Sequence, residues 1–369
     1  MKKKKAGPRI IFASFILILC LPWAFWLLFE QVSDTANHEN RSFAAMPRLR
    51  PGTYRQFAAD FTSYLNDAMP FRNDLITLNS GIDYSVFHAS SNDSVIIGKG
   101  DWLFYCNQED GDPLASYQGK DLLPEDKLAR MAENLVQQRD YLASLGKEFV
   151  LFIAPNKERI YSEYMPEWYG APAENYRALQ VYQYLKGNTD LRVIYAYDEL
   201  MEAREAAEED LYYKTDTHWN AVGGYIGARL LLRELGVELP AIEAGEIKIT
   251  HQGQHTGDLA NMLNLSRQLD YASPEYLVSG YPENGCSLQG GELLEPFSCT
   301  AEDADPRKLY MIRDSFSIAM YPYLGSQFRE SCFRDYYSDL NEDFREQDPD
   351  IVVAEVVERK LEELAGFVF

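Results

Sequence analysis

The chain has 369 residues, with 57 acidic side chains against 35 basic ones and a formal net charge of -22. Nucleic acid and anionic lipid headgroups would be repelled by such a surface, so we expect neither as a partner of the folded part. The five cysteines show no Cys-x-x-Cys or Cys/His spacing typical of metal sites, and we expect no cofactor and no metal.

The N-terminal segment predicts a membrane anchor. A basic head over residues 1–9 is followed by 20 residues, 10–29, that contain no charged side chain. This length is enough to cross a bilayer as a helix, and the clustered positive charge is expected to stay in the cytoplasm. We therefore expect a single-pass protein of the cell membrane, with a linker over residues 30–53 and an extracytoplasmic domain over 54–369. The alternative is a cleaved signal peptide, but no convincing small-x-small cleavage site follows the apolar run.

The first elements after the linker are expected to be a helix and a hairpin. Four aromatic side chains recur at helical spacing from Tyr54 to Tyr64, and this amphipathic helix should end before Pro70. Two apolar runs over 95–97 and 102–105 are separated by a turn that contains two glycines, a pattern typical of a β-hairpin.

From Pro124 onward, helical and strand patterns alternate, which predicts an α/β domain with a parallel sheet flanked by helices. Residues 149–154 are wholly apolar and suit a strand buried on both faces. Further strands are expected at 192–195, 309–312 and 351–356. Helices are expected at 128–145, 176–185 and 221–235. The span from about 238 to 305 is irregular and predicts an insertion of loops and short strands. Within it, Cys286 and Cys299 would form either a disulfide bond across a short loop or two free buried thiols.

Two short motifs contain the residues of a candidate catalytic site. Asp216-x-His218 precedes the helix expected over 221–235, and Asp314-Ser315 follows an expected strand. A serine hydroxyl needs a nearby imidazole as base and a carboxylate that orients the imidazole. We predict Ser315 as the nucleophile, His218 as the base and Asp216 as the orienting carboxylate. Either motif alone is more often a helix cap, so the prediction depends on their combination.

The position of Ser315 favours this interpretation. It would lie on a strand-to-helix turn at the carboxyl edge of the sheet, where open α/β sheets bind ligands. A helix is expected to begin within residues 317–324, and backbone N–H groups at its start would form part of an oxyanion hole.

Together these motifs resemble the DHHW family and the SGNH-hydrolase-like domain of the alginate O-acetylation proteins AlgX and AlgJ. Other matching segments follow in the same order: Glu39-Asn40-Arg41, Met69-Pro70-Phe71-Arg72, Ile97-Gly98-Lys99, Trp102-Leu103-Phe104-Tyr105, Ala154-Pro155-Asn156-Lys157, Gly257-Asp258-Leu259-Ala260 and Val356-Val357-Glu358-Arg359. The resemblance implies an SGNH-hydrolase-like (flavodoxin-like) fold in which Asp216, His218 and Ser315 form the triad. It also implies O-acetylation of an exported or cell-surface polysaccharide, beside a multi-pass membrane O-acyltransferase that delivers the acyl group.

The chain departs from ordinary SGNH enzymes at two points. Its serine motif comes last, as in the AlgX-type domain, and Arg313 stands where those enzymes have a glycine. Arg313 would stabilise an oxyanion or hold Asp314. Further candidates for the oxyanion hole or the substrate cleft are Asn156, Asn220, Asn261 and Arg359.

The expected activity is a ping-pong O-acetyl transfer through an acetyl-serine, and attack by water would make the same residues an acetylesterase. Two other functions stay open. A metal-dependent hydrolase would add His251 and His255 to the first motif, although Gly253 argues against the helix that this spacing requires. A non-catalytic polysaccharide-binding or scaffold protein of a cell-envelope assembly would use some of the 25 tyrosines to stack on sugars.

Overall fold

The computed structural model describes residues 7–29, 42–49, 54–69, 71–290, 296–336 and 340–366. Most of the predicted basic head and of the predicted linker lies outside the described residues. The chain divides into two compact units, one over Met1–Asn92 with Asn261–Leu265, the other over Asp93–Ala260 with Ser266–Phe369. The predicted domain start at residue 54 stays a prediction.

The first unit contains helices α1 (Gly7–Phe29), α2 (Tyr54–Asp67) and α3 (Arg72–Ile82), followed by the π-helical turn η2 (Asp83–Phe87). Helix α1 covers the predicted anchor, and its large apolar side chains between Ile10 and Leu21 are exposed. Within the described part of the chain, no helix meets the length and apolarity needed to cross a bilayer. Helix α2 has the predicted bounds, and its Phe57 and Phe61 rings stack with centroids 5.7 Å apart.

The second unit is built on a mixed sheet, which counts seven strands within the described residues. Their order is β4 (Val193–Tyr195), β3 (Glu148–Ala154), β11 (Ile351–Val357), β9 (Asp305–Arg313), β10 (Phe328–Asp335), β8 (Phe297–Thr300) and β7 (Ser287–Gly290). The first five are parallel and include all four predicted strands, whereas β8 and β7 add antiparallel pairs. The expectation of a purely parallel sheet is therefore wrong, because the second half of the predicted insertion extends the sheet edge.

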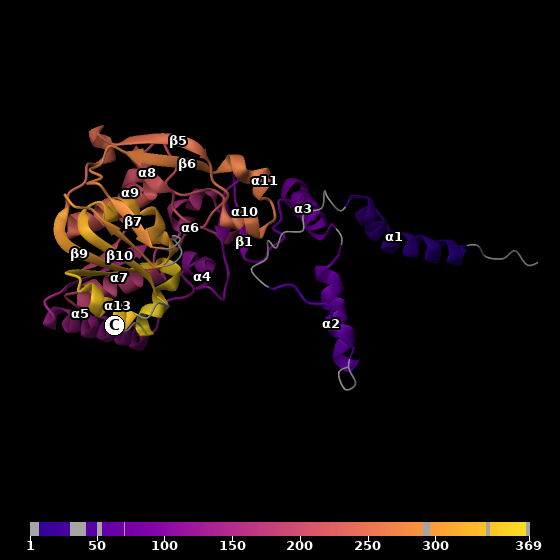
Figure 1. The fold of residues 1–369 in the computed structure, drawn as a ribbon, viewed down its shortest axis with the longest axis horizontal. Helices are drawn as coiled ribbons and strands as arrows, with labels where there is room; N and C mark the ends of the chain where they lie inside the picture. Colours follow the sequence, from indigo (N-terminus) through magenta and orange to yellow (C-terminus); the bar gives the residue numbers. More distant parts are fainter. Residues whose placement is uncertain are drawn as a thin grey trace, which may run out of the picture. The chain divides into compact units, whose positions relative to one another are not determined.

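Helices cover both faces of the sheet (Figure 1). Alternate residues of β3 belong to different core clusters, with Val150 and Phe152 on one face and Leu151 and Ile153 on the other. The first face packs on α8 (Tyr197–Ala206) and α9 (Ala221–Glu234). The second packs on α5 (Glu125–Ser144), α7 (Arg177–Asn188) and α13 (Leu340–Gln347). Burial on both faces explains why β3 is wholly apolar from Phe149 to Ala154.

Smaller elements complete the unit. The predicted hairpin is confirmed as β1 (Val95–Ile97) and β2 (Leu103–Tyr105), and β5 (Lys248–Gln254) with β6 (Pro274–Ser279) forms a separate antiparallel pair. The short helical segments are α4 (Pro113–Tyr117), α6 (Lys157–Ile160), α10 (Asp258–Met262), α11 (Ser266–Leu269), α12 (Tyr321–Gly325) and the 3-10 helices η3 (Ser162–Tyr164), η4 (Glu167–Tyr169), η5 (Ile242–Ala244), η6 (Asp270–Ala272), η7 (Ser315–Ala319) and η8 (Glu358–Gly366).

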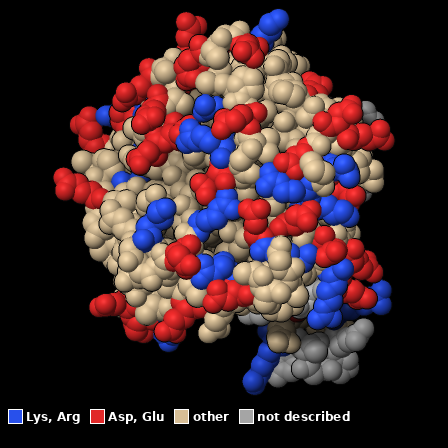
Figure 2. Space-filling model, turned by 90° about the vertical axis from the view of Figure 1, so that its left-hand side faces the viewer, with Lys and Arg blue, Asp and Glu red and all other residues tan. Residues whose placement is uncertain are grey.

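Charged side chains of both signs share the surface. On the face drawn in Figure 2, Asp and Glu are interspersed with Lys and Arg. The negative net charge is therefore not gathered into one patch on this face.

Candidate active site

Ser315 lies directly after β9, at the first residue of η7. The preceding Asp314 fixes this turn, because its carboxylate accepts N–H bonds from Phe316 at 2.8 Å and from Val357, at the end of β11, at 2.6 Å. The backbone N–H of Asp314 in turn donates to Glu355 Oε2 at 3.0 Å. The predicted helix is replaced by this 3-10 turn and the short α12. Since Asp314 takes up the N–H of Phe316, that donor does not face an oxyanion.

The base comes from the segment before α9. Trp219 is buried and its Nε1 donates to the carbonyl oxygen of Phe316 at 2.8 Å, which ties this segment to the turn of the nucleophile. Helix α9 packs closely on the same turn, because a Cβ added at Gly224 would meet the carbonyl oxygen of Ala319 at 2.2 Å. Asn220 begins α9 as its cap: its Oδ1 accepts from the N–H groups of Val222 and Gly223.

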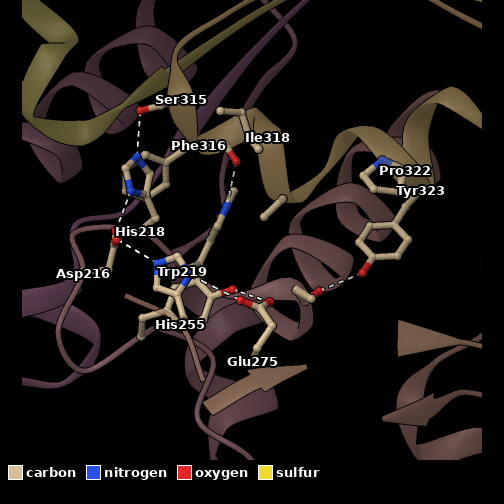
Figure 3. Close-up of a pocket in the computed structure, with 13 residues that line it drawn as sticks. Asp216, His218, Trp219, His255, Glu275, Ser315, Phe316, Ile318, Pro322 and Tyr323 are labelled. Carbon is tan, nitrogen blue, oxygen red and sulfur yellow. Dashed lines mark hydrogen bonds and ion pairs between the residues drawn. The ribbon is translucent and has the colours of Figure 1, made fainter. Parts of the chain in front are cut away.

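The structure brings the three predicted catalytic residues together (Figure 3). His218 Nε2 lies 2.7 Å from Ser315 Oγ, and His218 Nδ1 lies 2.6 Å from Asp216 Oδ1. These distances are those of a hydrogen-bonded chain from hydroxyl to imidazole to carboxylate. This row of hydrogen bonds can pass the serine proton to His218 while Asp216 stabilises the imidazolium.

Asp216 is buried and accepts four hydrogen bonds. Its Oδ1 also accepts the backbone N–H of His218 at 2.9 Å, while Oδ2 binds His255 Nε2 and the backbone N–H of Asp258, each at 2.9 Å. Burial works to raise the pKa of Asp216, but the hydrogen bonds from His218 and His255 outweigh it and hold that pKa well below its ordinary value. Asp216 is therefore ionised at neutral pH.

His255 is a second histidine on the same carboxylate, and sequence reasoning missed this role. Its Nδ1 lies 3.3 Å from Glu275 Oε2, and its ring stacks on Tyr213 with centroids 3.8 Å apart. Tyr213 also donates its hydroxyl to Glu275 Oε1 at 2.7 Å. Burial lowers the pKa of His255, but the bonds to Asp216 and Glu275 raise it to about 9. A protonated imidazole donates from both nitrogens, which suits a position between two carboxylates.

Asp258 holds the residue between Asp216 and His218. Its carboxylate accepts the backbone N–H of Thr217 at 2.8 Å and the hydroxyl of Thr217 at 2.6 Å. Burial, together with the charge of Asp216, raises the pKa of Asp258. Gly257 permits this approach, since a Cβ there would lie 1.9 Å from the carbonyl oxygen of Thr215. The sequence signal was the Gly257-Asp258 segment, to which no role was assigned.

The arrangement bears on the metal alternative. Ligand atoms of Asp216, His218 and Asp258 lie within 4.8 Å of one another, but the carboxylates already accept bonds from imidazole and from Thr217. His251 lies on strand β5 and His255 directly follows it, so neither histidine is on a helix. The helix that a zinc pair at this spacing would need is therefore not formed.

Lys157 supports the base segment from inside the protein. Its ammonium group is buried and donates to the carbonyl oxygens of Tyr213, Lys214 and Asp216 at 3.0, 3.0 and 2.5 Å. Burial lowers the pKa of Lys157 to about 8, against the attraction of Asp216. The neighbouring Asn156 is also buried, and among the described residues its Nδ2 has no hydrogen-bond partner.

The other predicted candidates occupy different positions. Arg313 is buried, with its guanidinium carbon 5.4 Å from the centre of the Phe297 ring, and burial lowers its pKa against the attraction of Glu355. The guanidinium carbon of Arg359 lies 5.5 Å from the ring of Phe316, the residue after the nucleophile. Asn261 is exposed and belongs to the first unit.

Two cavities of different character meet at Ser315. One, of about 380 Å³, is mostly apolar and is lined by Tyr213, Asp216, His218, Trp219, Ala221, His255, Glu275, Ser315, Phe316, Ile318, Ala319, Pro322 and Tyr323. The other, of about 260 Å³, is lined mostly by charged side chains: Arg313, Asp314, Ser315, Asp335, Tyr336, Lys360 and Glu363. Ser315 therefore borders both cavities, which differ in the share of charged residues among their lining.

Known proteins share this fold. PatB1 of Bacillus cereus superposes with a TM-score of 0.53 at 17% identity, over 73% of this chain and 97% of that one. A DHHW family protein from Eubacterium siraeum gives a TM-score of 0.51 at 16% identity, over 67% and 90%. At these identities the likeness shows the fold alone.

Sequence relatives point the same way. The chain is 26% identical to the probable alginate O-acetylase AlgJ of Pseudomonas aeruginosa, over 71% of this chain and 65% of that protein. It is 28% identical to the AlgJ of Azotobacter vinelandii, over 57% and 52%. The chain thus spans less than two thirds of the length of these relatives.

A family model decides the assignment and confirms the resemblance. The model of the SGNH hydrolase-like domain, acetyltransferase AlgX, matches residues 95–296, which is more than half of the chain and includes Asp216 and His218. The match ends before Ser315, whose position beside His218 is given by the structure. The chain belongs to the AlgX family of SGNH hydrolase-like domains.

Proposed function

We propose that this chain is a serine O-acyltransferase, or an esterase when water replaces the acceptor, that modifies a polysaccharide through an acyl-serine intermediate. The observation that carries the proposal is the unbroken hydrogen-bonded chain from Ser315 through His218 to Asp216. An activated serine next to a cavity is the arrangement that nucleophilic acyl transfer requires.

The reaction has two matched steps. In the first, His218 Nε2 takes the proton of Ser315, Oγ bonds to the carbonyl carbon of the acyl donor, and the leaving oxygen departs with that proton. In the second, an acceptor hydroxyl gives its proton to His218 and bonds to the same carbon, and Ser315 Oγ leaves and is reprotonated. Asp216 stabilises the imidazolium in both steps.

The acceptor in this proposal is a hydroxyl group of an exported or cell-surface polysaccharide. Its support is the family and the relatives whose name is probable alginate O-acetylase. The charged cavity beside Ser315 is lined by Lys360 and Glu363, which form an ion pair at 3.2 Å. A multi-pass membrane protein that supplies the acyl group belongs to the same proposal.

The location of the reaction is proposed from the N-terminal segment. The basic head, the uncharged residues 10–29 and the exposed apolar side chains of α1 support a membrane anchor with the catalytic unit outside the cytoplasm. Protease added to intact cells should digest the catalytic unit. Digestion only after lysis would contradict this location.

The test uses the full chain in detergent with p-nitrophenyl acetate and a serine-reactive fluorophosphonate probe. Ser315→Ala should remove labelling and lower turnover by about 10⁴-fold, because the nucleophile is absent. Ser331→Ala is the matched control, since it removes a buried serine hydroxyl from β10 and should keep wild-type labelling and wild-type turnover. Adding oligosaccharides of different polymers then separates transfer from hydrolysis. Equal labelling of wild type and Ser315→Ala, or no labelling of a folded wild type, would contradict the proposal.

A further inference from the structure

The apolar cavity at Ser315 has more room than an acetyl group needs. Its volume of about 380 Å³ falls in the range of roughly 300–1,000 Å³ usual for small-molecule sites. The methyl group of an acetyl is about the size of a water molecule, which takes up ~30 Å³ in the liquid. An acetyl-serine would therefore leave most of this cavity filled with water against apolar walls.

The walls follow directly from the nucleophile. The turns after Ser315 supply Phe316, Ile318 and Pro322, and Tyr323 closes the far end in the close-up (Figure 3). The start of α9 supplies Ala221, whose carbonyl oxygen accepts the hydroxyl of Tyr323. An acyl chain on Ser315 Oγ would enter this space without crossing any other part of the protein.

The polar groups in the cavity are already paired with one another. His255 lies between Asp216 and Glu275, and Glu275 also accepts the hydroxyl of Tyr213. The hydroxyl of Tyr323 donates to the carbonyl oxygen of Ala221 at 3.2 Å. A sugar ring would find these groups engaged, whereas a hydrocarbon chain needs no hydrogen bonds and gains by leaving water.

We propose that the acyl group this site prefers is a linear chain longer than acetyl, of about four to six carbons, held in the apolar cavity between Ser315 and Tyr323. The inference rests on the proposed acyl-transfer function and specifies its donor as a short-chain acyl ester or thioester. The charged cavity beside Ser315 is left for the acceptor. The covalent step is unchanged: Oγ bonds to the carbonyl carbon, and the donor oxygen or sulfur leaves with the serine proton.

The experiment measures kcat/KM for p-nitrophenyl acetate, butyrate, hexanoate and octanoate with the full chain in detergent. Each buried methylene should raise kcat/KM about fourfold, so butyrate, which has two more methylenes, should exceed acetate by roughly 15-fold. Ala221→Leu places three further carbons in the cavity and should abolish this rise. Ala206→Leu is the matched control, because it adds the same atoms at an exposed alanine of α8 and should keep the chain-length profile.

The outcomes are separable from those of the proposed function. Ser315-dependent turnover that is highest for acetate and falls with chain length would overturn the longer acyl chain and leave the acyltransferase intact. No Ser315-dependent turnover of any ester would overturn both. A rise that survives in Ala221→Leu would place the chain elsewhere and overturn the inference. Ile318→Ala gives a second variant that should weaken the preference by loosening the wall, with thermal unfolding as the check on folding.

Discussion

The two halves of the candidate site are held in different ways. The turn that contains Ser315 is held by carboxyl groups that accept main-chain N–H groups, since Asp314 binds those of Phe316 and Val357 and Glu355 binds that of Asp314. The segment that contains His218 is fixed by ionisable side chains, because Asp216 is held by His255 and Thr217 by Asp258. The nucleophile thus depends on the sheet, and the base depends on a network of charges.

This difference predicts where the site is sensitive. A bond from a main-chain N–H to a carboxyl group has one partner that titrates, whereas a pair of imidazole and carboxylate has two. Changes in the base segment should therefore alter the pH dependence, and changes near the nucleophile turn should act mainly on stability.

The largest effect is expected for Asp216→Asn. An amide cannot orient His218 in the same tautomer or stabilise its protonated form, so kcat should fall by about 10³–10⁴-fold. His255 should titrate at a lower pH in this variant, because it loses a carboxylate partner. NMR of the histidine rings measures the tautomer of His218 and the titration of His255, and steady-state kinetics measure kcat. Asp258→Asn is the matched control, with at most about a tenfold loss, since Asp258 binds Thr217. Nearly full activity of Asp216→Asn would show that both halves are held alike.

A smaller effect with a clear pH signature is expected for His255→Gln. The pKa of His255 is raised to about 9 from an ordinary 6.5, so its contribution to stability is complete below about pH 6.5 and is lost as the pH rises through 9. The wild type should be more stable than the variant by about 1–2 kcal/mol at pH 6, after allowance for solvent screening, and the difference should shrink by pH 10. Denaturant unfolding at several pH values measures it.

Activity and a control complete the test of His255. With a positive charge removed from Asp216, the acid limb of the kcat/KM profile should move to higher pH, and kcat should fall about tenfold or less. His251→Gln changes an exposed histidine of β5 and should leave both profiles as in the wild type. A stability difference that is independent of pH would assign His255 a packing role only.

The smallest effect is expected for Glu355→Gln, below the nucleophile turn. Burial, and next the charge of Asp314, raise the pKa of Glu355 well above its ordinary value. Glutamine keeps an oxygen for the N–H of Asp314, and activity should change by less than about threefold. Because the folded pKa is raised, the wild type should lose stability relative to this variant as the pH rises above about 4.5.

Glu355→Ala distinguishes packing from charge. It removes the acceptor of a buried N–H and should cost about 1–3 kcal/mol of stability. Equal stabilities of the alanine and glutamine variants would show that the bond to Asp314 does not hold the turn.

The sequence predicted the parts of the molecule with a regular pattern. Residues 149–154 predicted strand β3, because burial on both faces requires an apolar run. The two Asp-containing motifs predicted that Asp216, His218 and Ser315 lie together. Strand β10 was missed, since FRESCFRD mixes charged and apolar side chains. The antiparallel strands β7 and β8 are too short to show a period, and they lie in a span that looked like an insertion.

The residues that support the site could not be predicted from the sequence for another reason. His255, Glu275 and Asp258 come from a region without clear periodicity, and nothing local shows that they fold back onto residues 216–218. The fact that the chain has only five histidines was the one available signal for His255. Pairing across distant loops is set by the tertiary fold, which local patterns do not encode.

The position of β11 has a consequence for how the protein is made. Although it is the last strand along the chain, it lies between β3 and β9 and pairs with both, and its end supplies the N–H of Val357 that holds Asp314. A chain synthesised from its N-terminus cannot complete the sheet centre until these residues emerge, so the nucleophile turn forms last.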